Sequence, residues 1–213
     1  MRFLTTLMAV VALAVAPVYA QQADIAAIAN ASVFFYSASP LGAARIASAT
    51  TLGANVTAES ATELQGATHV ELWLGARAWI FEVAKLPAAG QAVADTEVKL
   101  NGSTTTLRAA AVQISAALAS KGNLAVFTNG MRGVIVSIVQ IGAASTLTAS
   151  PMTVQATGAT HVELLVAGHS RHYKIVTLGT TMNAIVVTAV TITPSEDRDL
   201  PQLTLLDVLI DLL

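Results

Sequence analysis

The chain has 213 residues and a formal net charge of -2, and only 11% of its residues are charged, against about 25% in an average soluble protein. So few basic residues exclude the positively charged surface that binding to nucleic acid or to an anionic membrane requires. Cysteine is absent, which excludes both a disulfide framework and a thiolate metal site. Hydrophobic residues make up 54% of the chain, so its surface either consists largely of small uncharged side chains or is covered by something else.

Residues 1–20 have the pattern of a secretory signal peptide. Arg2 supplies the positive start, an apolar stretch follows, and residues 18–20 form a small-x-small cleavage site directly after Pro17. The apolar stretch is shorter than the roughly 20 residues of a membrane-spanning helix. We therefore expect a secreted, periplasmic or cell-surface protein with no membrane span after cleavage, in which residues 21–30 form a short N-terminal segment. The alternative is an uncleaved N-terminal anchor.

A seven-residue sequence, Gly-Ala-Thr-His-Val-Glu-Leu, occurs twice, at residues 66–72 and again at residues 158–164. The offset is 158 minus 66, or 92 residues, and similar residues flank both copies. Solenoid repeats have shorter periods of about 20 to 50 residues, so this repeat indicates a duplicated domain. We predict a tandem duplication with module 1 at residues 31–121 and module 2 at residues 122–213.

Each module is predicted to be mainly β, with five or six mostly antiparallel strands followed by one C-terminal helix. In the first module, residues 32–37 are rich in aromatic and β-branched side chains, and residues 43–51 and 54–62 are weaker strands. In the second, residues 124–128 form a strand, and the nearly continuous apolar run at residues 133–141 is typical of a central strand. The modules form either two small barrels or one merged sandwich.

Apolar and polar residues alternate within the repeated sequence, which is the period of a half-buried strand. Two-residue turns at residues 75–76 and 167–168 then determine the register of a hairpin in each module. The predicted pairs are Leu74 with Arg77, Leu72 with Trp79, Val70 with Phe81, His69 with Glu82, Glu71 with Ile80, Glu163 with His172, and His161 with Lys174.

His161, Glu163 and His172 come together on one face of the second hairpin in this register. Two imidazoles and a carboxylate are a common ligand set for a metal ion, so these residues are a candidate metal site. The alternative is an ordinary solvent-facing polar surface, because the first copy has no counterpart of His172. The chain contains no catalytic sequence motif, so we expect a non-enzymatic protein without a cofactor.

Trp73 shares its strand face with His69 and Glu71. A flat aromatic ring beside a carboxylate suits the binding of a sugar or a peptide, so these three residues are a candidate binding site. The second copy has Leu165 in place of the tryptophan, and the alternative is that the neighbouring module simply covers Trp73.

Each module is predicted to end in a helix. The first begins at a cap formed by Ser103 or Thr104 and has a buried stripe of Leu107, Ala110, Ala111, Ile114, Ala117 and Leu118. The corresponding stripe of the second helix is Leu203, Leu206, Leu209, Ile210 and Leu213. Leu205, Val208 and Leu212 are then apolar residues on the outer side, and we predict that they form an interface with the other module or with another subunit.

Two functions from different classes fit these features. The first is a structural or interaction protein of the cell exterior that associates with itself or docks to another extracytoplasmic protein, because a low charge removes the repulsion between copies. The second is an exported binding module for a metal, a glycan or an apolar ligand, which would occupy the His-x-Glu face or the space between modules.

Overall fold

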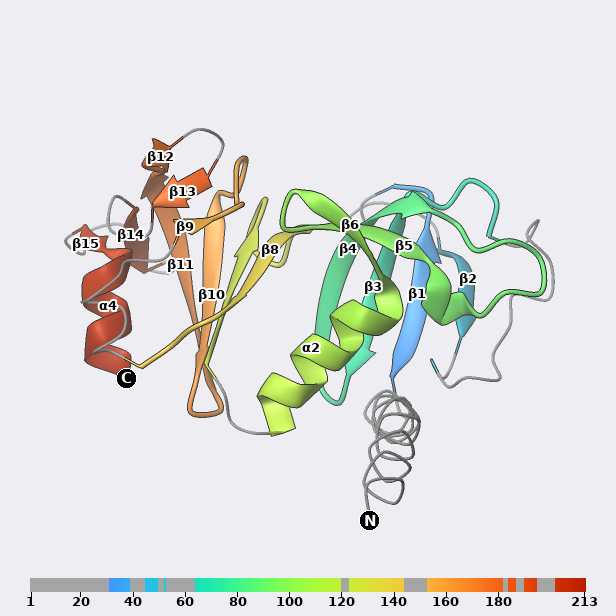
Figure 1. Ribbon diagram of the computed structural model, residues 1–213, viewed down its shortest axis with the longest axis horizontal. Coiled ribbons are helices and arrows are strands. Elements are labelled where there is room, and N and C mark those ends of the chain that lie inside the picture. Colours follow the sequence, from blue (N-terminus) through green and yellow to red (C-terminus); the bar gives the residue numbers. More distant parts are fainter. Residues whose placement is uncertain are drawn as a thin grey trace, which may run out of the picture.

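The computed structural model describes residues 31–38, 45–49, 52, 64–119, 123–143, 153–181, 184–186, 190–194 and 202–213. This part of the chain is mainly β, as predicted, with two antiparallel six-stranded sheets lying side by side and the helices α2 and α4 (Figure 1). The predicted signal peptide at residues 1–20, the N-terminal segment at residues 21–30 and the predicted strand at residues 54–62 lie outside the described residues.

The first sheet has the strand order β2-β1-β3-β4-β5-β6. Its strands are β1 (Ser32–Tyr36), β2 (Arg45–Ala49), β3 (His69–Leu74), β4 (Arg77–Lys85), β5 (Glu97–Leu100) and β6 (Ser103–Thr106). A short 3-10 turn, η1 (Val93–Asp95), precedes β5, and α2 (Leu107–Ala119) follows β6.

The second sheet has the order β15-β14-β11-β10-β7-β8. Its strands are β7 (Leu124–Thr128), β8 (Ile135–Gln140), β10 (His161–Val166), β11 (His169–Thr177), β14 (Thr191–Pro194) and β15 (Leu203–Thr204), and α4 (Leu205–Leu212) ends the chain. A third, three-stranded sheet consists of β9 (Thr153–Val154), β12 (Thr180–Thr181) and β13 (Ala184–Val186). When the first sheet is read from β2 and the second from β8, both have the same order: the second strand in the chain, then the first, then the third to the sixth.

The central strands of the two sheets agree in length and in pairing. Strands β7, β10 and β11 begin at positions 124, 161 and 169, each 92 above the starts of β1, β3 and β4 at 32, 69 and 77. His69 pairs with Tyr36, and His161 pairs with Thr128 in the same register. All of the predicted hairpin pairs are present, which confirms the two-residue turns.

A tight turn explains why both copies of the repeat begin with glycine and alanine. Gly66 and Gly158 have φ angles of 86° and 88°, a left-handed conformation that glycine adopts without steric cost. The next residues, Ala67 and Ala159, are buried and donate backbone hydrogen bonds that close the turn. This part of the repeat therefore has a structural role.

Helix α2 packs on the first sheet largely as the sequence predicts. Its residues Leu107, Ala110, Ala111, Ile114 and Ala117 are buried in one cluster with Val70, Leu72 and Phe81. The predicted cap was wrong, because residues 103–106 extend the sheet as β6 before the helix begins. The backbone N–H of Ala109 instead donates to Oγ1 of Thr106, at 3.2 Å.

Helix α4 buries a different stripe from the one predicted, and the two share only Leu209 among the fully buried residues. Leu205 and Leu209 are fully buried and Val208 is 6% exposed, whereas Leu203 is 42% exposed. Leu212 packs against the same core from a partly buried position. The predicted interface of Leu205, Val208 and Leu212 is therefore wrong, because these side chains cover the protein's own second sheet.

The connection that precedes α4 explains this change of helix phase. The backbone N–H of Leu107 donates to the carbonyl of Thr96 at 2.8 Å, and that of Leu205 donates to Val190 at 2.8 Å. These equivalent helix starts lie 205 minus 107, or 98, residues apart instead of the 92 that separate the hairpins. At about 100° per residue, the six additional residues shift the buried stripe by about a third of a turn around the helix.

The apolar sequence of β8 predicted a central strand. This prediction was wrong, because β8 is an edge strand of the second sheet. Its outer edge lies against β4 and β5 of the first sheet, where Ile80 and Val134 form a bridge. Asn101 bonds to this edge: its N–H donates to Val136 O at 3.0 Å, and its Oδ1 accepts from Ile138 N at 2.9 Å. The run is apolar because both of its faces and its edge are covered.

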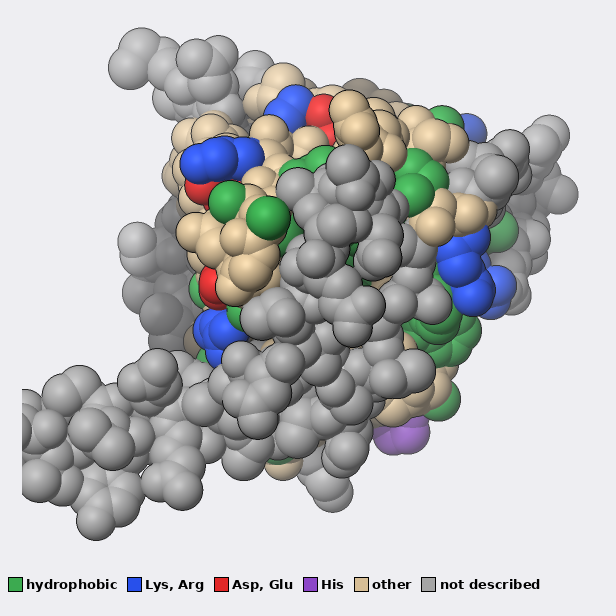
Figure 2. Space-filling model, turned by 90° about the vertical axis from the view of Figure 1, so that its right-hand side faces the viewer, with side chains coloured by type: hydrophobic (Ala, Val, Ile, Leu, Met, Phe, Trp, Pro, Cys, Tyr) green, Lys and Arg blue, Asp and Glu red, His purple; other side chains and the backbone are tan. Residues whose placement is uncertain are grey.

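The described residues on the end face of the first sheet carry charge in small, scattered groups. Figure 2 views the molecule from the end formed by the first sheet, where Lys and Arg side chains are separated by Asp, Glu and uncharged side chains. Within the described residues, neither helix combines the length and the apolar character that crossing a membrane would require.

Candidate ligand-binding pocket

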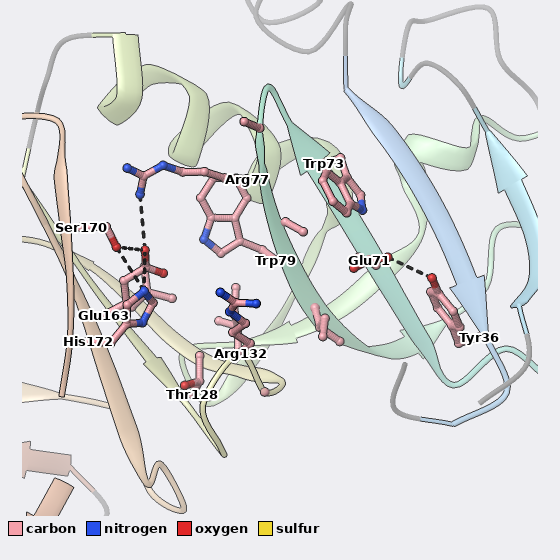
Figure 3. Close-up of a pocket in the computed structure, with 16 residues that line it drawn as sticks. Tyr36, Glu71, Trp73, Arg77, Trp79, Thr128, Arg132, Glu163, Ser170 and His172 are labelled. Atoms are coloured by element: carbon pink, nitrogen blue, oxygen red, sulfur yellow. Dashed lines mark hydrogen bonds and ion pairs between the residues drawn. The ribbon is translucent and has the colours of Figure 1, made fainter. Parts of the chain in front are cut away.

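A pocket of about 580 Å³ lies at the junction of the two sheets (Figure 3). Strands β3 and β4 and Tyr36 of β1 supply one side, and β10 and β11 supply the other. Arg132, in the loop between β7 and β8, lies between these sides and points into the pocket. The pocket therefore requires both sheets.

Corresponding faces of the two sheets meet at this pocket. Glu71 and Glu163 occupy the same position of the repeat and line opposite sides, as do Tyr36 and Thr128. The residues that differ between equivalent positions of the two sheets include Trp73, because its counterpart Leu165 does not line the pocket. The result is a cavity with one aromatic side and one mainly polar side.

The carboxylate of Glu163 is the centre of the polar side. Nη1 of Arg77 lies 3.3 Å from Oε1 of Glu163, and this ion pair connects the two sheets. The hydroxyl of Ser170 donates to the same oxygen, and Nε2 of His172 lies 3.8 Å from it. Arg77 also donates to the carbonyl of Gly168, at 3.4 Å.

The structure does not assemble the predicted metal site of His161, Glu163 and His172. Glu163 and His172 come together, but within the described part of the chain no three potential ligands are close enough to share a metal ion. Nδ1 of His161 is 2.9 Å from Oγ1 of Thr160. In addition, the guanidinium of Arg77 occupies the position beside Glu163 where a cation would bind, and it would repel that cation.

The predicted binding residues Glu71 and Trp73 both line the pocket, whereas His69 does not. The hydroxyl of Tyr36 donates to Oε2 of Glu71 at 2.9 Å. Burial and this hydrogen bond raise the pKa of Tyr36, so its hydroxyl is protonated and can donate at neutral pH. Trp73 remains 37% exposed, so the neighbouring module does not cover it.

Sequence reasoning missed Arg77 and Arg132 as pocket residues. The predicted register did contain a signal for Arg77, because it placed this charged residue opposite Leu74 on the core side of the hairpin. An arginine on the core side of a hairpin requires an acidic partner, which here comes from the other sheet. Arg132 had no such signal, because it lies in a loop whose position depends on the packing of β8.

We expect the free energy of unfolding to decrease as the pH falls below about 6.5, the ordinary pKa of histidine. Burial lowers the pKa of His69, although the nearby carboxylate of Glu82 acts in the opposite direction. Burial, together with the charges of Lys174 and His172, also lowers the pKa of His161. These histidines therefore bind protons more readily in the unfolded chain than in the folded protein. The stability that they contribute is fully present above the histidine pKa of the unfolded chain, and it is lost as the pH falls through the lower pKa values of the folded protein.

Urea unfolding at about pH 7.5 and about pH 5.5 measures this loss. The double substitution His69→Asn and His161→Asn should make it smaller. An unchanged loss in the double variant would assign the pH dependence to other groups.

Comparisons with protein-family models, with curated proteins and with solved structures found no match to this chain.

Proposed function

We propose that this is an exported, non-enzymatic binding protein whose ligand occupies the pocket between the two sheets. The observation that carries the proposal is the meeting of Trp73 and Glu71 with Glu163, Ser170 and His172 in one cavity. An apolar surface combined with a few convergent polar groups is the usual composition of a ligand site. Export rests on the signal-peptide pattern of residues 1–20.

The chemistry of the pocket favours a saccharide over the other ligands considered. The exposed ring of Trp73 offers a flat apolar surface on which the C–H face of a pyranose can stack. Oε2 of Glu71 accepts from Tyr36, and among the described residues its Oε1 has no bonded partner and can accept from a sugar hydroxyl. Arg77 disfavours a metal ion, and the many polar groups disfavour a purely apolar ligand.

The serine, histidine and glutamate of the pocket support binding and not catalysis. In a nucleophilic triad, the imidazole contacts the serine through one nitrogen and the carboxylate through the other. Here Nε2 of His172 is 3.3 Å from Ser170 Oγ and is also the atom nearest Glu163, at 3.8 Å. The hydroxyl of Ser170 donates directly to Glu163, and the same carboxylate oxygen is paired with Arg77.

We also infer that the two sheets arose by tandem duplication of a unit of about 92 residues. The repeated sequence, the shared strand order and the matching registers of the central strands support this origin. The ligand site then lies between two copies of the same face, and differences such as Trp73 against Leu165 make it asymmetric. The duplication would thus have created the pocket.

Self-association has less support than the sequence suggested. The stripe of Leu205, Val208 and Leu212 faces the protein's own core, so it offers no surface to another subunit. Light scattering on the mature chain, residues 21–213, separates the two functions. A binding protein of this kind is expected at the mass of one chain, and a much larger mass would favour assembly.

Replacing Trp73 by leucine is expected to weaken saccharide binding by about tenfold, because the stacking surface is lost. Leucine occupies the equivalent position in the second copy, at Leu165, so the strand should accept it and the melting temperature should stay unchanged. Saccharides found to bind on a glycan array are titrated by calorimetry against both proteins.

Val176→Ala is the control, because Val176 is 41% exposed and lies outside the residues that line the pocket. Equal affinities for the parent and the Trp73→Leu variant would reject this pocket as the site.

A further inference from the structure

Arg132 is the pocket arginine whose charge is not compensated. Arg77 is paired with Glu163, and Glu71 accepts from Tyr36. No ion pair or hydrogen bond joins the side chain of Arg132 to any residue in the part of the chain that the structure describes. Its guanidinium therefore has hydrogen-bond donors available to a ligand.

The loop at residues 129–134 holds Arg132 in place through a strained backbone. Arg132 has a φ of 56°, a left-handed backbone conformation that residues other than glycine, asparagine and aspartate rarely adopt. The backbone N–H of Gly133 donates to Gly130 O at 2.9 Å, and Thr128 Oγ1 donates to the same carbonyl at 2.8 Å. A Cβ at Gly133 would lie 2.8 Å from the carbonyl oxygen of Asn129, so this turn is closely packed. Strain of this kind is concentrated at functional sites.

We propose that the ligand is an acidic saccharide with one negatively charged group per bound sugar, and that Arg132 binds this group. The proposal rests on the function proposed above. The guanidinium can form two parallel hydrogen bonds to a carboxylate or a sulfate, while the sugar ring stacks on Trp73 and a hydroxyl donates to Glu71. Figure 3 shows Arg132 between the two sides of the pocket, so one sugar can contact it from either side.

The other charges of the pocket limit the ligand to a single negative group. Glu71 and Glu163 line the same cavity, and a polyanion would place further negative charges against these carboxylates. A neutral sugar would form no ion pair with Arg132, whose side chain is otherwise exposed to water. The acidic group can be the carboxylate of a uronic acid or a sulfate ester, which share this recognition chemistry.

Calorimetric titration with galacturonate, with neutral galactose and with a monosulfated galactose tests the proposal. We expect the acidic sugars to bind at least about tenfold more tightly than the neutral one, with a preference that declines as salt is raised. The acidic probe that binds more tightly shows whether the pocket prefers a carboxylate or a sulfate. Equal affinity for acidic and neutral sugars would overturn the role of Arg132 but leave saccharide binding intact, whereas no binding of any probe would overturn both.

The substitution Arg132→Asn should remove the preference for acidic sugars while keeping the fold, because asparagine tolerates the left-handed conformation. Arg132→Gly provides the same test if the asparagine variant is unstable, and Arg132→Lys should restore part of the preference. Arg171→Asn is the matched control, since Arg171 is exposed on β11 and does not line the pocket. An acidic preference that survives in both neutral variants of Arg132 would contradict the proposal.

Discussion

Replacing Leu205 by alanine is expected to lower the free energy of unfolding by about 2 to 5 kcal/mol, the usual range for a fully buried leucine. Leu205 has no exposed surface and lies at the first turn of α4, in the cluster that includes Ile192 of β14 and the preceding Val190. The smaller side chain would leave a cavity between the helix and the sheet. Urea denaturation of the parent and the variant measures the difference.

The matched control is Leu203→Ala, the same change two residues earlier. Leu203 is 42% exposed on β15, so its replacement is expected to change the stability by less than about 0.5 kcal/mol. The helix phase expected from the 92-residue offset would bury Leu203 instead of Leu205, so it predicts the larger stability loss for Leu203→Ala. A larger loss for Leu203→Ala than for Leu205→Ala would therefore show that α4 packs in the other phase.

Replacing Asn101 by alanine is expected to cost about 2 to 4 kcal/mol, because hydrogen bonds and a favourable backbone conformation are lost together. Oδ1 of Asn101 accepts from Ser137 Oγ at 2.7 Å and from Ile138 N at 2.9 Å, and Ser137 is fully buried. The φ of 54° at Asn101 also suits asparagine far better than alanine. Thermal denaturation measures the loss, and hydrogen exchange should show reduced protection of the amides of β8.

Asn101→Asp is the control for the acceptor. Aspartate tolerates the same left-handed conformation and keeps an oxygen at the position of Oδ1, so its stability loss should be smaller than that of Asn101→Ala. Comparable losses for the two variants, with unchanged exchange in β8, would mean that this contact does not connect the sheets. Because β8 also carries Ile135 into the pocket, the contact helps to position the ligand site.

Much of the central architecture could be predicted because it depends on near neighbours. The alternation in the repeat and the two-residue turns were enough to predict the pairing of His69 with Glu82 and of Glu163 with His172, and both pairs are present. The candidate residues Glu71 and Trp73 were also predicted to share a face, and both line the pocket. These relations hold within a single hairpin, where turn length alone decides which side chains are opposite.

The sequence by itself determined the mainly β class, the registers of the two hairpins and the buried stripe of α2. Only the tertiary structure decided the phase of α4, the edge position of β8 and the meeting of Arg77, Arg132 and Glu163 in one pocket. The phase depends on how many residues the chain uses before it returns to the sheet, and the repeat does not encode that length. The pocket depends on contacts such as Arg77 with Glu163, 86 residues apart, which arise only when one sheet docks on the other.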